Sequence, residues 1–236
     1  MKTILHRSES RGEANFGWLQ SRHTFSFGNY YDSQRMNFGA LRVINDDKVK
    51  GGQGFGTHPH KNMEIISIPL VGALEHKDSM GNSGVIQNGD IQVMSAGTGI
   101  RHSEFNHNAD EVVEFLQIWV IPNKDNVTPR YDQLTMDAGA RKNKLQQILS
   151  PNPDDDGVWI HQDAWFFMSD LDKDNSIEYS LQHPDNGVYI FVLNGKITAA
   201  DQELEKRDGL GVLETETFTV TAHDDAQVLF MEVPMK

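Results

Sequence analysis

The 236-residue sequence has no cysteine, few basic residues and no long hydrophobic run. Without cysteine the chain can form no disulfide, thiolate metal site or cysteine nucleophile, and a reducing compartment suits it. The 34 acidic residues outnumber the 21 basic ones, and a net charge of -13 would repel nucleic acid and anionic membranes. The apolar runs are too short for a signal peptide or a membrane span. We therefore expect a cytoplasmic protein, monomeric, with no direct nucleic-acid or membrane partner.

Short β-type runs recur from residue 40 onward, separated by Gly, Asn and Asp. They are ALRVI, MEIISIPLV, GVIQ, DIQVMSA, VVEFLQIWVI, VYIFVL, FTVTA and AQVLFMEV. This spacing favours an all-β sandwich or barrel over βαβ units. Residues 123–157 differ, because prolines surround a helix-like MDAGARKNKLQQIL. We interpret them as a short helix-containing linker between an N-terminal metal-binding domain (1–122) and a C-terminal domain (158–236).

The two β-rich halves show a faint internal repeat. Aligning Gly72 with Gly195, each of which follows a β run, places His60 opposite His183. A duplicated β module is the interpretation that this alignment supports.

The strongest chemical motif is Thr57-His58-Pro59-His60, followed some forty residues later by Arg101-His102-Ser103-Glu104. In a strand, side chains i and i+2 point to the same face, so His58 and His60 project together, as do His102 and Glu104. Two such strands on neighbouring or facing walls would bring three imidazoles and one carboxylate together. That set is typical of a metal site, with Glu104 as both ligand and catalytic base.

Glu64 is an alternative to Glu104 as the carboxylate ligand, because it shares strand parity with His58 and His60 if the strand is unbroken. Pro59 favours an irregular strand there. We prefer Glu104 and expect Glu64 to orient a ligating imidazole from the second shell. Nitrogen and oxygen donors without sulfur disfavour a structural zinc site and suit one divalent transition metal per chain, with Fe first and Mn, Co, Ni, Cu or Zn as alternatives.

Three runs of sequence carry a family resemblance. Residues 23–32 (HTFSFGNYYD), 54–104 (GFGTHPHKNMEIISIPL through GIRHSE) and 115–122 (FLQIWVIP) resemble the pirin family of the cupin superfamily, in particular its bacterial pirin-like quercetinase branch. The resemblance covers about residues 12–133. It implies a bicupin with two jelly-roll β-barrels and a mononuclear metal only in the first barrel. The ligands it implies are His58, His60, His102 and Glu104.

The same resemblance implies a function. Some members of the family are similar to quercetin 2,3-dioxygenase, which cleaves the flavonol heterocycle with O2, and others are transcription co-regulators. We expect a metal-dependent dioxygenase acting on a small aromatic, flavonol-like substrate. The alternatives are a metal- or redox-sensing regulatory binding protein without turnover and a cupin enzyme that does not use oxygen. Leu181 stands opposite His58 in the C-terminal half, so we expect no metal there.

Apolar and aromatic side chains near these motifs are candidates for the substrate pocket. The expected lining residues are Phe25, Phe55, Met63, His76, Met94 and Phe105, and Phe27 and Trp119 are also available.

Overall fold

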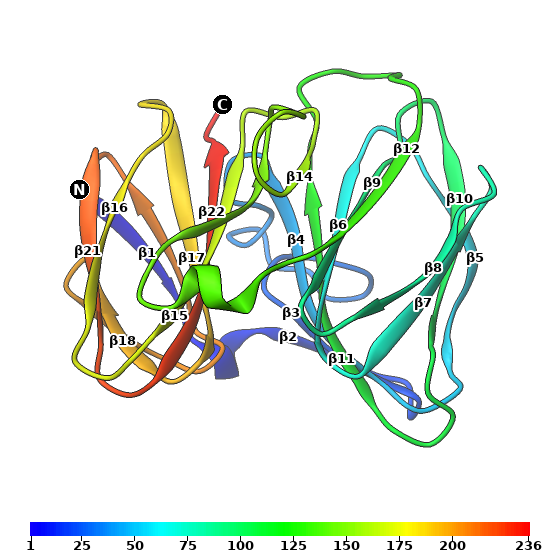
Figure 1. Cartoon of the computed structure of the whole chain (residues 1–236), viewed down its shortest axis with the longest axis horizontal. Helices are drawn as coiled ribbons and strands as arrows, with labels where there is room; N and C mark the ends of the chain where they lie inside the picture. The colour runs from blue at the N-terminus through cyan, green and yellow to red at the C-terminus, as the bar shows by residue number, and fades with distance from the viewer.

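The computed structural model describes residues 1–236 and consists almost wholly of β-strands. Figure 1 shows two barrels side by side, the first mainly cyan to green and the second mainly yellow to red. The only helical turns are the 3-10 helices η1 (Ser8–Ser10) and η2 (Ala138–Arg141). The all-β, two-module prediction is confirmed, and the helix expected in the linker shrinks to η2. No helix has the length and apolar character needed to cross a membrane.

The first barrel combines a seven-stranded and a four-stranded sheet. The large sheet has the order β12 (Arg130–Thr135), β9 (Asp90–Ser95), β6 (Glu64–Val71), β11 (Val113–Val120), β4 (Leu41–Val49), β3 (Leu19–His23) and β2 (Gly12–Asn15). The small sheet has the order β5 (Gly54–His60), β10 (Ile100–Asn106), β7 (Ala73–Asp78) and β8 (Ser83–Gln87).

The second barrel repeats this plan. Its large sheet has the order β1 (Lys2–His6), β20 (Gly209–Leu213), β17 (Asn186–Asn194), β22 (Ala226–Pro234), β15 (Trp165–Leu171), β13 (Gln146–Ser150) and β14 (Val158–Trp159). Its small sheet has the order β16 (Ser176–Ser180), β21 (Thr217–Ala222), β18 (Lys196–Ala199) and β19 (Gln202–Glu205). Gly72 and Gly195 occupy the equivalent β6–β7 and β17–β18 turns, both with positive φ (73° and 84°), where a side chain would be strained.

Two segments cross between the halves. Strand β1 pairs with β20, so the blue N-terminal strand lies in the second barrel (Figure 1). The segment after residue 122 supplies β12 to the first large sheet and β13 and β14 to the second. These exchanges tie the two modules together through backbone hydrogen bonds.

The two large sheets also share a hydrophobic core. On β6, Ile66 and Ile68 point into this shared core, whereas Ile65 and Ser67 point into the first barrel. Period-2 alternation therefore gives each large sheet two buried faces.

The interiors of the barrels differ. The second barrel holds one cluster of 18 buried hydrophobic residues, whereas the first holds two small clusters of 6 and 4 residues. Polar side chains take up the remaining interior of the first barrel, including Ser67, His102, Glu104 and Gln117. Burying polar groups costs free energy unless they are paired, so these side chains indicate that the interior of the first barrel has a role other than stabilising the fold.

Candidate metal centre

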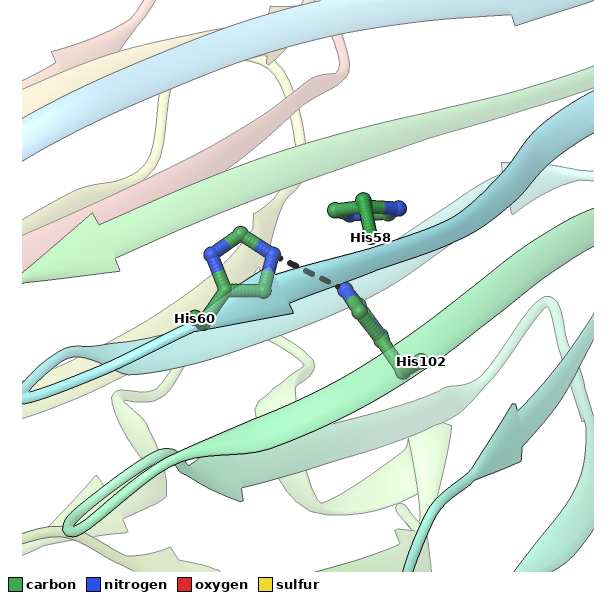
Figure 2. Close-up of side chains that lie close together, drawn as sticks. All are labelled: His58, His60 and His102. Atoms are coloured by element: carbon green, nitrogen blue, oxygen red, sulfur yellow. Dashed lines mark hydrogen bonds between the residues drawn. The ribbon is translucent and has the colours of Figure 1, made fainter.

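Three imidazoles converge inside the first barrel. Strands β5 and β10 are antiparallel neighbours, with His58 opposite His102 and His60 opposite Ile100. All three rings therefore share one face, and Figure 2 shows them turned toward one another. The Nε2 atoms of His60 and His102 are 3.0 Å apart, and one ring nitrogen from each of the three residues lies within 4.8 Å of the others.

Hydrogen bonds behind the rings set which nitrogen faces the centre. His58 Nδ1 lies 2.8 Å from the carbonyl oxygen of Gly56, to which it donates, so its Nε2 is left with a lone pair. His102 Nδ1 lies 3.5 Å from His76 Nδ1, and His76 Nε2 lies 3.5 Å from Asp78 Oδ2. This chain of carboxylate, imidazole and imidazole supports His102 from behind, as outer partners of metal-binding histidines do.

The electrostatics favour neutral imidazoles. Burial, helped by the neighbouring His58, lowers the pKa of His60 to about 4. Burial, together with the three surrounding histidines, lowers the pKa of His102 to about 2. Neutral imidazole is the form that binds a metal.

The spacing of these donors fits one transition-metal ion. Two nitrogens bound at right angles, each about 2.1 Å from an ion, would lie about 3 Å apart. The separation of the His60 and His102 nitrogens is 3.0 Å. The residues present can therefore hold a metal, and their nitrogen donors do not choose among the first-row ions.

Glu104 lies beside the imidazoles on β10. The β5–β10 register shifts between His102 and Glu104, yet Glu104 keeps an inward position and groups with His76 and His102 within 4.8 Å. Gln117 Nε2 donates to its carboxylate at 2.9 and 3.1 Å, and Ser67 Oγ donates at 3.2 Å. Burial, with a smaller contribution from Asp47, raises the pKa of Glu104 to about 7. These hydrogen bonds fix the side chain in place, with a carboxylate of the kind that serves as a general base.

A cavity of about 250 Å³ opens onto this centre. The His58, His60, His102 and Glu104 side chains line one part of it. The remaining walls combine aromatic rings with buried polar groups: Phe27, Tyr30, Phe55, Trp119, Ser21, His23, Asn45 and Asp47 are among them. An apolar pocket with a few convergent polar groups is the usual form of a small-molecule site.

Glu64 does not lie in this site. Asn62 has a left-handed φ of 48°, which interrupts the extended backbone between β5 and β6. Glu64 therefore does not share strand parity with His60. Glu64 projects from β6 on the face opposite Ser67, toward the shared core, where Ser95 Oγ donates to it at 2.6 Å. It makes no hydrogen bond to any of the clustered imidazoles, contrary to the orienting role expected from the sequence.

Comparison with known proteins agrees with the fold. The family model described as "Pirin" matches residues 5–120, and "Quercetinase C-terminal cupin domain" matches residues 147–233. The chain is 44% identical over 230 residues to the quercetin 2,3-dioxygenase of Escherichia coli strain K12, covering 98% of each chain. The chain belongs to the pirin family. It is also 38% identical to a pirin-like protein of Caulobacter vibrioides, covering 94% of this chain and 95% of that one.

A solved pirin structure matches almost the whole chain. The Escherichia coli bacterial pirin YhhW in complex with nickel(II) has a TM-score of 0.93 and 42% identity, covering 99% of each chain. The bicupin architecture expected from the resemblance is therefore confirmed.

Only part of the expected pocket residues of this pirin line the cavity. Phe55 lines the cavity, as do Phe27 and Trp119. His76 lies behind His102 instead of in the cavity, with its ring tilted against Tyr131 at 4.8 Å between centroids.

Besides His76, four more of the expected pocket residues lie outside the cavity, and the pocket prediction is corrected for all five. Phe25 belongs to the core shared by the large sheets and contacts Tyr189 at 5.6 Å between ring centroids. Met63 and Met94 pack in a small apolar cluster of the first barrel. Phe105 is 40% exposed, because it alternates with the inward residues of β10. Sequence proximity to the histidines could not tell the two faces of each strand apart.

Several cavity residues escaped the sequence analysis. Asn45 and Asp47 lie on β4 and Gln117 lies on β11, and all three polar side chains are buried. On the largely apolar β11, a polar residue at an inward position was the signal that could have identified Gln117. His23 lies in the HTFSFGNYYD run but had no role assigned to it.

The equivalent positions of the second barrel are apolar or aromatic. Counted from the turn glycines, the pair His58 and His102 corresponds to Tyr179 and Phe218, which lie opposite each other on β16 and β21. Glu104 corresponds to Val220, and all three counterparts belong to the 18-residue hydrophobic cluster. These positions offer no imidazole or carboxylate.

The strand register also corrects the sequence alignment of the halves. His58 has Tyr179 as its counterpart, where the alignment had placed Leu181. His183 lies beyond the end of β16, because the chain between β16 and β17 is longer than that between β5 and β6.

Proposed function

We propose that this chain is a metal-dependent dioxygenase that cleaves a flavonol such as quercetin with O2. The observation that carries the proposal is a cavity with aromatic walls that is lined by the His58, His60 and His102 cluster and by Glu104, which lies beside His102. The name of the Escherichia coli relative at 44% identity supports the same activity.

The proposed metal ligands are His58, His60, His102 and Glu104, with one divalent transition metal per chain. Iron is the first candidate, and nickel is a second, because the similar Escherichia coli pirin was solved with nickel(II). Three nitrogens and one oxygen leave positions free on an ion that prefers six ligands. When bound, the metal would supply a Lewis acid that favours the ionised form of a substrate hydroxyl.

Residues of the chain itself bind and orient the substrate and accept its proton. Glu104 accepts the proton of the substrate's enolic hydroxyl, and Gln117 and Ser67 keep its carboxylate aimed at the cavity. The rings of Trp119 and Phe27, 5.3 Å apart between centroids, form a wall against which a planar substrate can pack. This wall also limits the access of water to the reacting oxygen.

We assign the reaction to the first module and a structural role to the second. The large sheet of the second barrel buries the outer face of the first large sheet, and β1 anchors the N-terminus to it. That support holds β6 and β11, which carry Ser67, Gln117 and Trp119, in a fixed position.

The test is metal analysis of purified protein combined with aerobic quercetin turnover. We expect about one metal per chain, oxygen uptake in step with quercetin loss, and labelled oxygen from ¹⁸O₂ in the product. Chelator-treated protein and His223→Gln, which changes an exposed imidazole of the second barrel, serve as negative and positive controls.

Each failure points to a different alternative. Flavonol binding without oxygen uptake would favour a regulatory binding protein. Turnover without labelled oxygen in the product would favour a cupin enzyme that does not use O2.

A further inference from the structure

His23 presents a free nitrogen in the same cavity, away from the metal centre. It ends strand β3, is 4% exposed and lines the cavity wall. Its Nδ1 lies 2.8 Å from Asn45 Oδ1 and 3.3 Å from Ser21 Oγ, and its Nε2 has no partner in the protein. An amide oxygen only accepts hydrogen bonds, so Nδ1 carries the proton and Nε2 keeps its lone pair.

The ring is held neutral in this position. Burial lowers the pKa of His23, outweighing the opposing effect of its hydrogen bond to Asn45. Nε2 is therefore an acceptor at neutral pH, fixed in direction by Asn45 behind it.

A row of rings leads from the metal centre to His23. Centroids are 5.0 Å apart from His60 to Trp119, 5.3 Å from Trp119 to Phe27, and 5.4 Å from Phe27 to His23. Tyr30 continues the row beyond His23, with nearly parallel ring planes. The rings of Trp119 and Phe27 thus form the wall that runs from His60 to His23. A planar molecule of more than one ring would be needed to reach both ends.

We infer that His23 is the distal recognition residue of the cavity, with Nε2 accepting a hydrogen bond from a phenolic hydroxyl remote from the group that reaches the metal centre. The inference rests on the proposed function and narrows its substrate class. The substrate is a multi-ring phenol with one hydroxyl that reaches the metal centre and a second hydroxyl on a ring remote from it. A molecule whose far ring lacks a donor would leave a buried acceptor unpaired, and that costs binding.

The experiment measures anaerobic binding of two flavonols to the metal-loaded protein by quenching of tryptophan fluorescence. Quercetin carries hydroxyls on both outer rings, whereas 3-hydroxyflavone carries only the one assigned to the metal centre. The wild type should bind quercetin roughly 10-fold more tightly than 3-hydroxyflavone, because its buried acceptor is satisfied only by the first.

Two variants of His23 isolate the acceptor. His23→Phe keeps a ring but removes the acceptor, so quercetin affinity should fall roughly 10-fold while 3-hydroxyflavone affinity stays within about two-fold. His23→Gln provides an amide oxygen and should restore part of the preference. His223→Phe, the same change on the second barrel, should leave both affinities unchanged.

The outcomes separate this inference from the proposed activity. If the wild type binds both flavonols equally, or His23→Phe weakens both equally, the recognition role is wrong. If the wild type prefers quercetin through His23 but consumes no oxygen, the dioxygenase proposal fails and the recognition role stands. If no flavonol binds, both fail. The wild-type comparison needs no variant, so equal affinity for the two flavonols would refute the recognition role even if His23→Phe does not fold.

Discussion

Replacing Glu64 with Gln should make the protein more stable at alkaline pH and change its stability little near pH 5. Glu64 is 1% exposed, and burial raises its pKa from 4.5 to about 7, against the opposing effects of hydrogen bonds from the Ser95 hydroxyl and the His161 backbone and of the charge of Arg130. The folded protein therefore holds this proton more tightly than the unfolded chain does. It follows that the free energy of unfolding falls as the pH rises from about 4.5 to about 7 and levels off above that range.

The size of the effect follows from the pKa shift. At 1.36 kcal/mol per pKa unit, a rise from 4.5 to about 7 corresponds to a loss of about 3 kcal/mol in the free energy of unfolding. Most of this loss occurs between pH 5 and pH 8.5. For a chain of this length, about 3 kcal/mol corresponds to a shift of roughly 6 to 12 °C in the unfolding midpoint. In the variant, the Gln side chain keeps an oxygen that accepts the hydrogen bond from the Ser95 hydroxyl. Arg130 keeps two interactions that do not involve residue 64, its ion pair with Asp132 at 3.0 Å and its contact with the Trp159 ring at 4.0 Å.

The assay is urea or thermal unfolding of wild type and Glu64→Gln across pH 5 to 8.5, with metal content matched. The stability difference between the two proteins should grow with pH by about 3 kcal/mol. Glu178→Gln, on an exposed position of β16, is the matched control and should show no such trend. A difference that stays constant across this range would mean that Glu64 is ionised in the folded protein and paired with Arg130, and the reasoning from burial would be refuted.

Three further outcomes are expected at the metal centre. His60→Ala should reduce the metal content well below one ion per chain by elemental analysis, whereas His223→Ala should not; two ions per wild-type chain would contradict a single site. Glu104→Gln should lower quercetin turnover by ~10²- to 10⁴-fold while flavonol binding persists, and full activity would remove it as the base. His76→Phe should weaken metal affinity by ~10- to 100-fold, because His102 loses its Nδ1 partner. Unchanged affinity in a metal titration would show that this support is dispensable.

Much of the cluster of histidines and Glu104 could be predicted from the sequence, because it depends on the local geometry of two strands. Strand alternation alone places His58 with His60 and His102 with Glu104, whatever the remainder of the chain does. The two motifs needed only one further fact, that β5 and β10 are neighbours. Strand parity left neighbouring and facing walls open, and the family resemblance implied the four ligands and the two-barrel architecture.

The cavity depended on distant parts of the chain. Asn45, Asp47 and Gln117 enter it only because β4 and β11 pair in one register, with Asn45 opposite Gln117, and turn the same face inward. A shift of one residue would send these side chains to the shared core and bring Ile44 and Ile118 inside.

The dependence on distant parts of the chain also explains why the positions expected for some residues were wrong. Phe25 and Glu64 are close in sequence to site residues, yet the packing of the second barrel against the first turned their surroundings into a buried interface. The sequence by itself determined which side chains on a strand point together, since that follows from backbone geometry. The tertiary structure alone decided which face of each strand meets the cavity, because this is set by pairing and packing between segments far apart in the chain.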